Sequence, residues 1–260
     1  SGAATFASAT GDDSLTGADG DDSFGFAGGA LTANDTVVGG SGTDTVDITS
    51  NGVTVMTNVS GVETVLFSAA NASAITLSTG VVTISESGGA AQTITFGAAS
   101  TGVTANLGAG TDSLTLANGT NSVTTTNVEA VIGGTGADTI VTTTIATITG
   151  GAGADVITGG TGSNDTFIYT VAGGISSATS MDTITNLETA DIITLANKGT
   201  EVGIGGGTVR VTATITDVSI ASTLLEAANL VSTGDGSTNG RIEHFQYGGD
   251  TYLVEDMSAA

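Results

Sequence analysis

Glycine and aspartate recur at fixed spacing in this chain, in the pattern G-G-x-G-x-D-x-U-x, where U is a large apolar residue. Three stretches follow the pattern without a mismatch: Gly39–Asp47, Gly133–Val141 and Gly150–Thr158. The glycines permit turns with positive φ and expose backbone carbonyl oxygens, and the sixth-position Asp adds a carboxylate. Such an oxygen-rich turn suits calcium, a hard cation that takes several oxygen ligands.

The apolar eighth position is expected to point inward from a very short strand, so that two repeats wind into one coil of about 18 residues. The repeats that begin at Gly133 and Gly150 start 17 residues apart, close to one coil. Turns on the same side of neighbouring coils then face each other. We therefore expect Asp138 and Asp155 to flank one calcium ion.

Imperfect copies of the repeat extend the array, and they share the sixth-position Asp: Gly11–Thr16, Gly17–Phe24, Ala33–Val37, Gly108–Leu114 and Thr161–Phe167. The last of these contains a one-residue insertion. A Gly/Asp-rich linker is not expected to repeat with this regularity, so the pattern favours an ordered array.

The charge balance of the chain also indicates that cations bind to it. The chain has 26 acidic residues against three basic ones, a formal net charge of −23, and residues 1–197 hold 18 acids and no base. Such a chain repels itself unless cations bind to it. The missing basic patch excludes nucleic acid as a partner. No apolar run approaches the roughly 20 residues of a membrane span, which argues against direct membrane insertion.

The chain contains no cysteine and therefore no disulfide. Bound Ca²⁺ is thus expected to stabilise the fold in place of disulfides. We predict an all-β parallel β-roll or β-solenoid with calcium-binding turns over residues 1–170, with dense calcium sites at about 8–50 and 131–167. Residues 51–130 alternate apolar residues with Thr, as in Val53–Met56 and Thr93–Phe96. This period of two predicts strands of a solenoid without dense metal sites.

A second motif places Glu63, Glu129 and Glu188 directly after an apolar residue each time. These glutamates could bind calcium, cap a coil, or be plain surface carboxylates beside a recurring turn.

Residues 171–260 are predicted to form a small β-rich C-terminal cap that contains one short helix. Ser222–Val231 has apolar residues at helical spacing, with Ser222 as its N-cap. Ile242–Val254 predicts a β-hairpin that turns at Gly248–Gly249. A solenoid needs such a cap to cover its open end.

The nonapeptides resemble those of the RTX superfamily, whose members are exported by type I secretion and fold on calcium. The tail, especially Phe245–Tyr252, is similar to the C-terminal end of RTX-type bacterial S-layer proteins, as is the stretch Val62–Val65. The resemblance implies calcium ligation by the sixth-position aspartates, with glycine carbonyls beside them: Asp13, Asp22, Asp35, Asp44, Asp112, Asp138, Asp155, Asp165, Gly42, Gly136 and Gly153.

The residues of common hydrolases are missing. His244 is the only histidine, so a zinc motif of the H-E-x-x-H type cannot occur. There is no G-x-S-x-G nucleophile elbow, no Cys nucleophile and no phosphate loop. The paired carboxylates Asp12-Asp13 and Asp21-Asp22 could mimic a glycosidase pair, but they lie inside the calcium turns. We predict that the protein is not an enzyme.

Three functions stay open. The favoured one is a calcium-dependent extracellular structural protein, a self-assembling S-layer or surface-matrix subunit at the cell surface. Its partners would be further copies of itself, in a lattice or filament, and a cell-surface polysaccharide. The alternative is the C-terminal calcium-folding and type I secretion module of a larger adhesin or exoenzyme. The third is an ice- or carbohydrate-binding solenoid with threonine ladders from Thr124–Thr126 and Thr142–Thr144.

Overall fold

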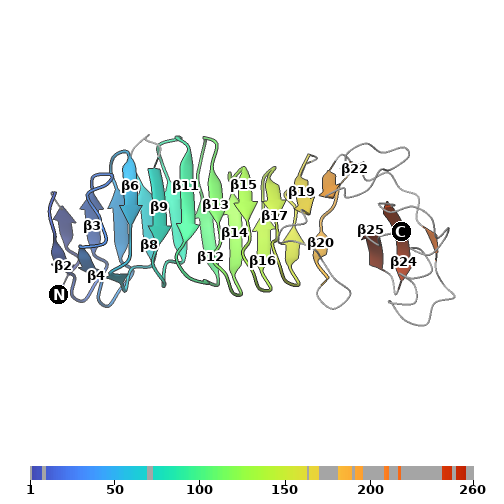
Figure 1. The fold of residues 1–260 in the computed structure, drawn as a ribbon. Helices are drawn as coiled ribbons and strands as arrows, with labels where there is room; N and C mark the ends of the chain where they lie inside the picture. Colours follow the sequence, from blue (N-terminus) through green and yellow to red (C-terminus); the bar gives the residue numbers. More distant parts are fainter. Residues whose placement is uncertain are drawn as a thin grey trace.

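The protein is a stack of short parallel strands that wind into a β-solenoid, as the computed structural model in Figure 1 shows. The structure describes residues 2–7, 10–68, 73–162, 164–169, 181–188 and 191–195, and the strands 208–210, 216–217, 242–247 and 250–255. Every regular element within this part of the chain is a β-strand. No helix among these residues is long and apolar enough to cross a membrane.

The strands form two long sheets and two short ones. The ten-stranded sheet consists, in order along the solenoid, of β1 (Thr5–Ala7), β3 (Ser23–Phe26), β5 (Thr45–Ile48), β8 (Thr64–Phe67), β10 (Thr83–Glu86), β12 (Val103–Asn106), β14 (Ser122–Thr126), β16 (Thr139–Thr142), β18 (Val156–Thr158) and β20 (Thr183–Thr185). The nine-stranded sheet consists of β6 (Gly52–Val55), β9 (Ser73–Leu77), β11 (Gln92–Phe96), β13 (Ser113–Thr115), β15 (Ala130–Ile132), β17 (Thr147–Thr149), β19 (Thr166–Tyr169), β21 (Ile192–Leu195) and the antiparallel β22 (Thr208–Arg210).

The first coils have a third side. A three-stranded sheet of β2 (Ser14–Thr16), β4 (Thr36–Val38) and β7 (Val59–Ser60) lies beside the first strands of the two long sheets. Asp22 and Asp44, at equivalent positions of neighbouring coils, are accordingly 22 residues apart. Asp138 and Asp155, where this side is absent, are only 17 apart.

The core is a thin layer between the two long sheets. Inward side chains stack in register from coil to coil, for example Ile75, Ile94 and Leu114 in the nine-stranded sheet. All three are at most 3% exposed. Their neighbours along each strand face solvent, which is the period of two that the sequence predicted. A slip of one residue would turn the apolar column outward, so burial fixes the register.

The predicted all-β parallel solenoid is confirmed, and so is its continuation through residues 51–130. The predicted C-terminal hairpin is confirmed as β24 (Ile242–Tyr247) paired antiparallel with β25 (Asp250–Glu255), and β23 (Thr216–Asp217) joins them in the second short sheet. The helix predicted at Ser222–Val231 lies outside the described residues. The division at residue 170 stays a prediction, and the parallel pairing continues past it to β21.

Truncation of a core residue tests this packing. Phe67 in β8 is 1% exposed, and Phe67→Ala should lower the free energy of unfolding by about 3–5 kcal/mol, because the cavity cannot close between two fixed sheets. The measurement is urea denaturation in saturating calcium. Val53→Ala removes a side chain that is 68% exposed and serves as the control, with a change within about 0.5 kcal/mol. Equal effects of the two substitutions would contradict this core.

Candidate calcium-binding turns

The sixth-position aspartates lie where a turn enters a strand, and nearly all of them are buried. Each precedes an inward-facing apolar residue by two positions, as Asp44 precedes Val46 in β5. The side chains that are at most 1% exposed are those of Asp22, Asp35, Asp44, Asp112, Asp138, Asp155 and Asp165. Asp13, in the first coil, is half-buried. The inserted residue before Asp165 does not displace it, because Asn164 absorbs the extra length with a φ of 108°.

One carboxylate oxygen of each buried Asp bonds to the preceding coil. The backbone N–H of Asp22 donates to Asp44 Oδ1 at 2.7 Å. In the same way the N–H of Asp138 donates to Asp155 Oδ1 at 2.8 Å. Asp138 and Asp155 therefore lie in neighbouring coils, as their spacing indicated. That they flank one calcium ion stays a prediction. Equivalent bonds join further pairs along the solenoid: Ala4 to Asp22, Asp13 to Asp35, Gln92 to Asp112, Asn121 to Asp138 and Ala146 to Asp165.

The second carboxylate oxygen divides the aspartates into two groups. In Asp44, Asp112, Asp155 and Asp165, Oδ2 is buried and has no hydrogen-bond partner. A buried carboxylate oxygen without a partner is costly, and a cation is the usual remedy. In the other group Oδ2 accepts a backbone N–H: from Ala18 in Asp22, Thr32 in Asp35 and Gly134 in Asp138.

The first glycine of each repeat leaves a gap beside this oxygen. A Cβ placed on Gly39 would overlap both Asp44 Oδ2 and the backbone oxygen of Gly61 in the next coil. A Cβ on Gly150 would lie 2.5 Å from Asp155 Oδ2. Glycine therefore keeps open a space that a carboxylate oxygen and a carbonyl oxygen share. Oxygens of these two kinds are the donors that Ca²⁺ prefers, so the residues present fit this ion.

The glycine at the fourth position of the repeat has a backbone reason of its own. Gly42, Gly136 and Gly153 have φ values of 141°, 120° and 148°, a region that other residues rarely adopt. A Cβ on any of them would overlap the turn of the preceding coil. Calcium ligation by their carbonyls, and by the individual aspartates, stays a prediction.

Among the described residues, no three His, Cys, Asp or Glu side chains form a ready-made metal cluster. A calcium ion at these turns would therefore be held by one or two carboxylates, such as Asp44 or Asp155, together with backbone carbonyls. The chemistry that the bound ion supplies is neutralisation of buried negative charge. The protein's own contribution is to hold one oxygen of each carboxylate in place through the N–H of the neighbouring coil.

The glutamate motif has the same place in the coil. Glu63 Oε2 accepts the backbone N–H of Asp44 at 2.9 Å, and Glu129 Oε2 accepts that of Asp112 at 2.7 Å. Two residues before these glutamates, Gly61 and Asn127 have positive φ values of 61° and 52°. This tight turn is shorter than the glycine-rich turn, and the longer Glu side chain reaches the same N–H. Glu63 and Glu129 therefore link neighbouring coils through a hydrogen bond. Calcium ligation by these glutamates stays a prediction.

Four more residues complete the ladder and were not predicted. Asp182 Oδ1 accepts the N–H of Asp155 at 2.9 Å, and Asp191 Oδ1 accepts that of Asp165 at 3.0 Å. Gln92 and Asn121 accept from Ser73 and Ser100 through their amide oxygens. The signal in the sequence was a D, E, N or Q two residues before an inward apolar residue, without the glycines of the nonapeptide.

Burial perturbs the acidity of these groups. Burial raises the pKa of Asp112 to about 6. The nearby negative charges of Glu129 and Glu86 also raise this pKa, whereas the hydrogen bond from the Gln92 backbone acts to lower it. Burial also raises the pKa of Asp182 to about 6 and raises the pKa of Asp155 and Asp165. In Asp35, burial acts to raise the pKa. The hydrogen bonds that its carboxylate accepts from Asp13 and Thr32 outweigh burial, so the pKa of Asp35 is lowered.

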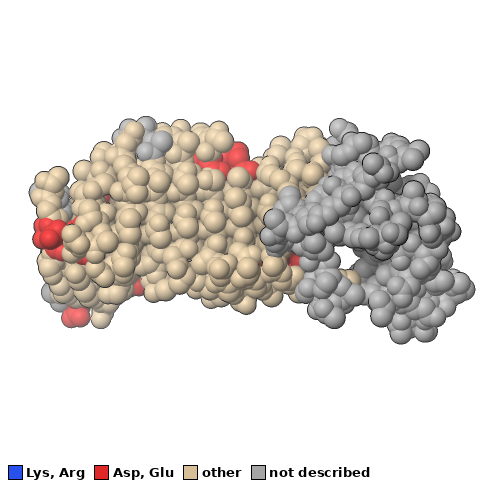
Figure 2. All heavy atoms as spheres, viewed as in Figure 1, with Lys and Arg blue, Asp and Glu red and all other residues tan. Residues whose placement is uncertain are grey.

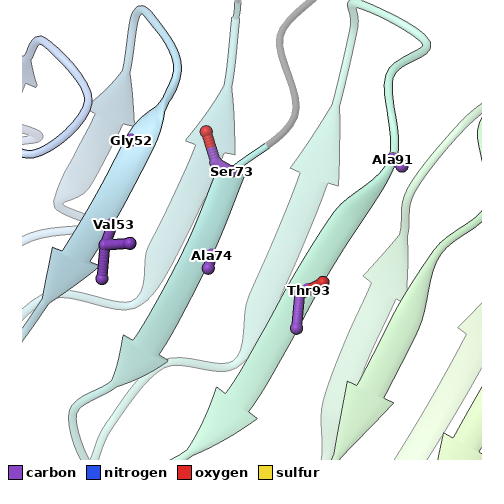
Figure 3. Close-up of a pocket in the computed structure, with 6 residues that line it drawn as sticks. All are labelled: Gly52, Val53, Ser73, Ala74, Ala91 and Thr93. Carbon is purple, nitrogen blue, oxygen red and sulfur yellow. The ribbon is translucent and has the colours of Figure 1, made fainter.

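The described surface also contains a hollow of about 390 Å³ on the outer face of the nine-stranded sheet (Figure 3). It lies where Ala74 stands between the larger side chains of Val53 and Thr93 in neighbouring strands. Its other lining residues are Gly52, Ser73 and Ala91. None of the six is an acid or a base, so the hollow offers no acid–base chemistry.

The two threonine triplets do not form the uniform outer ladder that the sequence suggested. Thr125 and Thr142 face the core and are 1% and 3% exposed. Outward hydroxyls do pair between coils, as Thr126 and Thr143 do at 2.7 Å. The triplets therefore supply alternating rather than continuous outer hydroxyls.

Comparison with known families identifies the turns. Residues 1–30, 30–47 and 146–166 match the family model of the RTX calcium-binding nonapeptide repeat, in four copies. No curated protein and no solved structure shows a significant match to the chain. The match supports Ca²⁺ as the bound ion. It covers six of the eight predicted aspartates and leaves out Asp112 and Asp138.

Replacement of a single carboxylate oxygen tests the role of the buried aspartates. Asp155→Asn keeps an oxygen for the Asp138 N–H but replaces the unpaired Oδ2 with an amide. We expect a several-fold increase in the calcium concentration at half-folding, followed by circular dichroism. Asp21→Asn removes the same charge from an exposed turn position and should leave the midpoint nearly unchanged. Identical midpoints for Asp155→Asn and the wild type would refute calcium ligation by Asp155.

The raised pKa values predict the pH dependence of the calcium-free protein. Because the folded-state pKa values of Asp112 and Asp182 are about 6, above the ordinary 3.8, their contribution to stability is complete below about pH 4 and is lost as the pH rises through 6. In chelator, more β-structure is therefore expected at pH 4 than at pH 7. With calcium present, the folded protein should bind calcium more weakly below pH 6, because protons compete for the same oxygens. Chelator spectra that do not change between pH 4 and 7 would contradict this.

Proposed function

We propose that this chain, an RTX-repeat protein, is a calcium-dependent extracellular structural protein, a self-assembling S-layer or surface-matrix subunit. Ca²⁺ binding to its turns drives both folding and assembly. RTX-repeat proteins are calcium-binding and are typically secreted, which supports the extracellular location. The placement in an S-layer, export by type I secretion and self-assembly are parts of the proposal.

The observation that carries the proposal is the set of buried, unpaired oxygens in Asp44, Asp112, Asp155 and Asp165. Residues 1–197 contain no Lys, Arg or His that could neutralise them. Without calcium, the stack has to bury these charges uncompensated, and the chain stays unfolded and fit for export. In the millimolar calcium of the exterior, binding is coupled to folding.

A structural role is supported by the absence of acidic and basic side chains from the hollow on the described surface. The hollow on the nine-stranded sheet contains no acid or base, and the chain's single histidine, His244, lies in β24. We therefore propose that the protein is not an enzyme. The similarity of its tail to the C-terminal end of RTX-type S-layer proteins favours a surface lattice.

Assembly is proposed to use the acidic residues that face outward. Asp12, Asp19 and Asp21 are exposed beside the turns of the first coils. Figure 2 shows that the acidic side chains of the described residues gather in a few patches at the ends and edges of the solenoid, while the broad face in view is free of them. Calcium ions that bridge such patches would join subunits into a lattice or filament, with a cell-surface polysaccharide as a further proposed partner.

A calcium titration tests the function. From chelator to about ten millimolar calcium, the range of weak extracellular sites, circular dichroism should show a transition from coil to β-structure. Size-exclusion light scattering should then show growth from monomers into large assemblies. A magnesium titration is the control, since Mg²⁺ tolerates such irregular oxygen sites poorly. Folding that stops at a monomer would instead favour the alternative, a calcium-folding and secretion module of a larger adhesin or exoenzyme.

A further inference from the structure

Two carboxylates are hydrogen-bonded to the same residue in the middle of the solenoid, away from the matched repeats. Glu86 ends β10, and Asp112 lies directly before β13. Both belong to the stretch between residues 47 and 146, which the RTX family model does not match. Glu86 is not part of a nonapeptide, and the turn before Asp112 has Leu107 where the repeat has its first glycine.

One residue, Gln92, holds both carboxylates. Its backbone N–H donates to Asp112 Oδ1 at 2.6 Å, and its side-chain Nε2 donates to Glu86 Oε1 at 3.0 Å. The N–H of Ala90 donates to the same Glu86 oxygen at 2.8 Å. These bonds fix one oxygen of each carboxylate on a common anchor.

The other oxygen of each carboxylate has no partner. Glu86 Oε2 and Asp112 Oδ2 are both buried and accept no hydrogen bond, and Asp112 as a whole is 1% exposed. The turn after β12 covers Glu86, since a Cβ on Gly108 would lie 3.4 Å from Glu86 Oε2. The two charges repel each other strongly enough to contribute to the raised pKa of Asp112.

We propose that Glu86 and Asp112 hold a divalent cation, Ca²⁺ in a calcium-containing medium, at a site in which Glu86, from outside the nonapeptides, joins the aspartate of the imperfect repeat Gly108–Leu114. Two carboxylates that are held in place and have buried, unpaired oxygens need a positive charge nearby, and a hard cation provides it. Residues 1–197 contain no basic side chain that could provide this charge instead of a cation. Because only two carboxylates take part, backbone carbonyl oxygens must complete the coordination. The ion would stabilise coils in which the glycine-rich repeat is incomplete.

The experiment counts bound calcium on the full chain, by equilibrium dialysis at pH 7 in fractions that are still monomeric. Glu86→Gln and Asp112→Asn should each bind one ion fewer than the wild type, and the double variant should also lose one ion rather than two. Glu129→Gln is the matched control: it removes the same charge next to Asp112 but keeps an oxygen for the Asp112 N–H. It should bind the wild-type number.

A second readout separates ion binding from a purely structural role. In chelator, Glu86→Gln should raise the melting temperature, because it removes repulsion between buried charges, and its further rise on adding calcium should be smaller than in the wild type. If Asp112→Asn does not fold, Glu86→Gln decides alone.

An unchanged ion count in Glu86→Gln, or the loss of an ion from Glu129→Gln instead, would overturn the assignment. An unchanged count together with the higher melting temperature in chelator would mean that the pair shares a proton and not a metal. The count is made on monomers, so failure of the proposed assembly leaves this test intact.

Discussion

The contact on which the whole stack depends is the hydrogen bond from a backbone N–H to a buried carboxylate of the following coil. It satisfies a donor at the start of a strand, where the sheet ladder has not yet begun, and it fixes the offset between coils. The pair Asp22 and Asp44 and the pair Asp138 and Asp155 are two examples among many. Where the nonapeptide is absent, Glu129, Gln92 or Asn121 supplies the acceptor oxygen.

The same contact creates the demand for a cation. It uses one oxygen of the carboxylate and buries the other, which in Asp44 and Asp155 has no partner in the protein. Stacking and the proposed calcium binding are therefore two consequences of one side chain. The core between the sheets is a single layer of residues such as Ile94 and Ile148, too thin to offset several buried charges without ions. We therefore expect calcium to be part of the folded state rather than an addition to it.

The elements that could be predicted from the sequence are those whose signal is local. The turn at Gly150–Asp155 and the strand that follows it lie within one nonapeptide, and the alternation in Thr93–Phe96 defines a strand by itself. The hydrogen-bond partners of Glu63 and Gln92 were not predictable in this way. Glu63 contacts a residue 19 positions away, and Gln92 joins Glu86 to Asp112 across two coils. Coil length varies along the chain, so a fixed period does not align these residues.

The sequence by itself determined the period-two strands, the glycine turns and the excess of acid, because each of these follows from residues that are neighbours in the chain or from composition. Only the tertiary structure decided which carboxylate oxygens are hydrogen-bonded and which are left without a partner. For Oδ1 that outcome depends on the offset between coils, because its donor lies in the neighbouring coil, as the N–H of Asp138 does for Asp155. Asp138 and Asp155 occupy the same place in the repeat, yet Oδ2 accepts an N–H from its own turn in the first and has no partner in the second. The offset results from packing of side chains many residues apart, which no local pattern encodes.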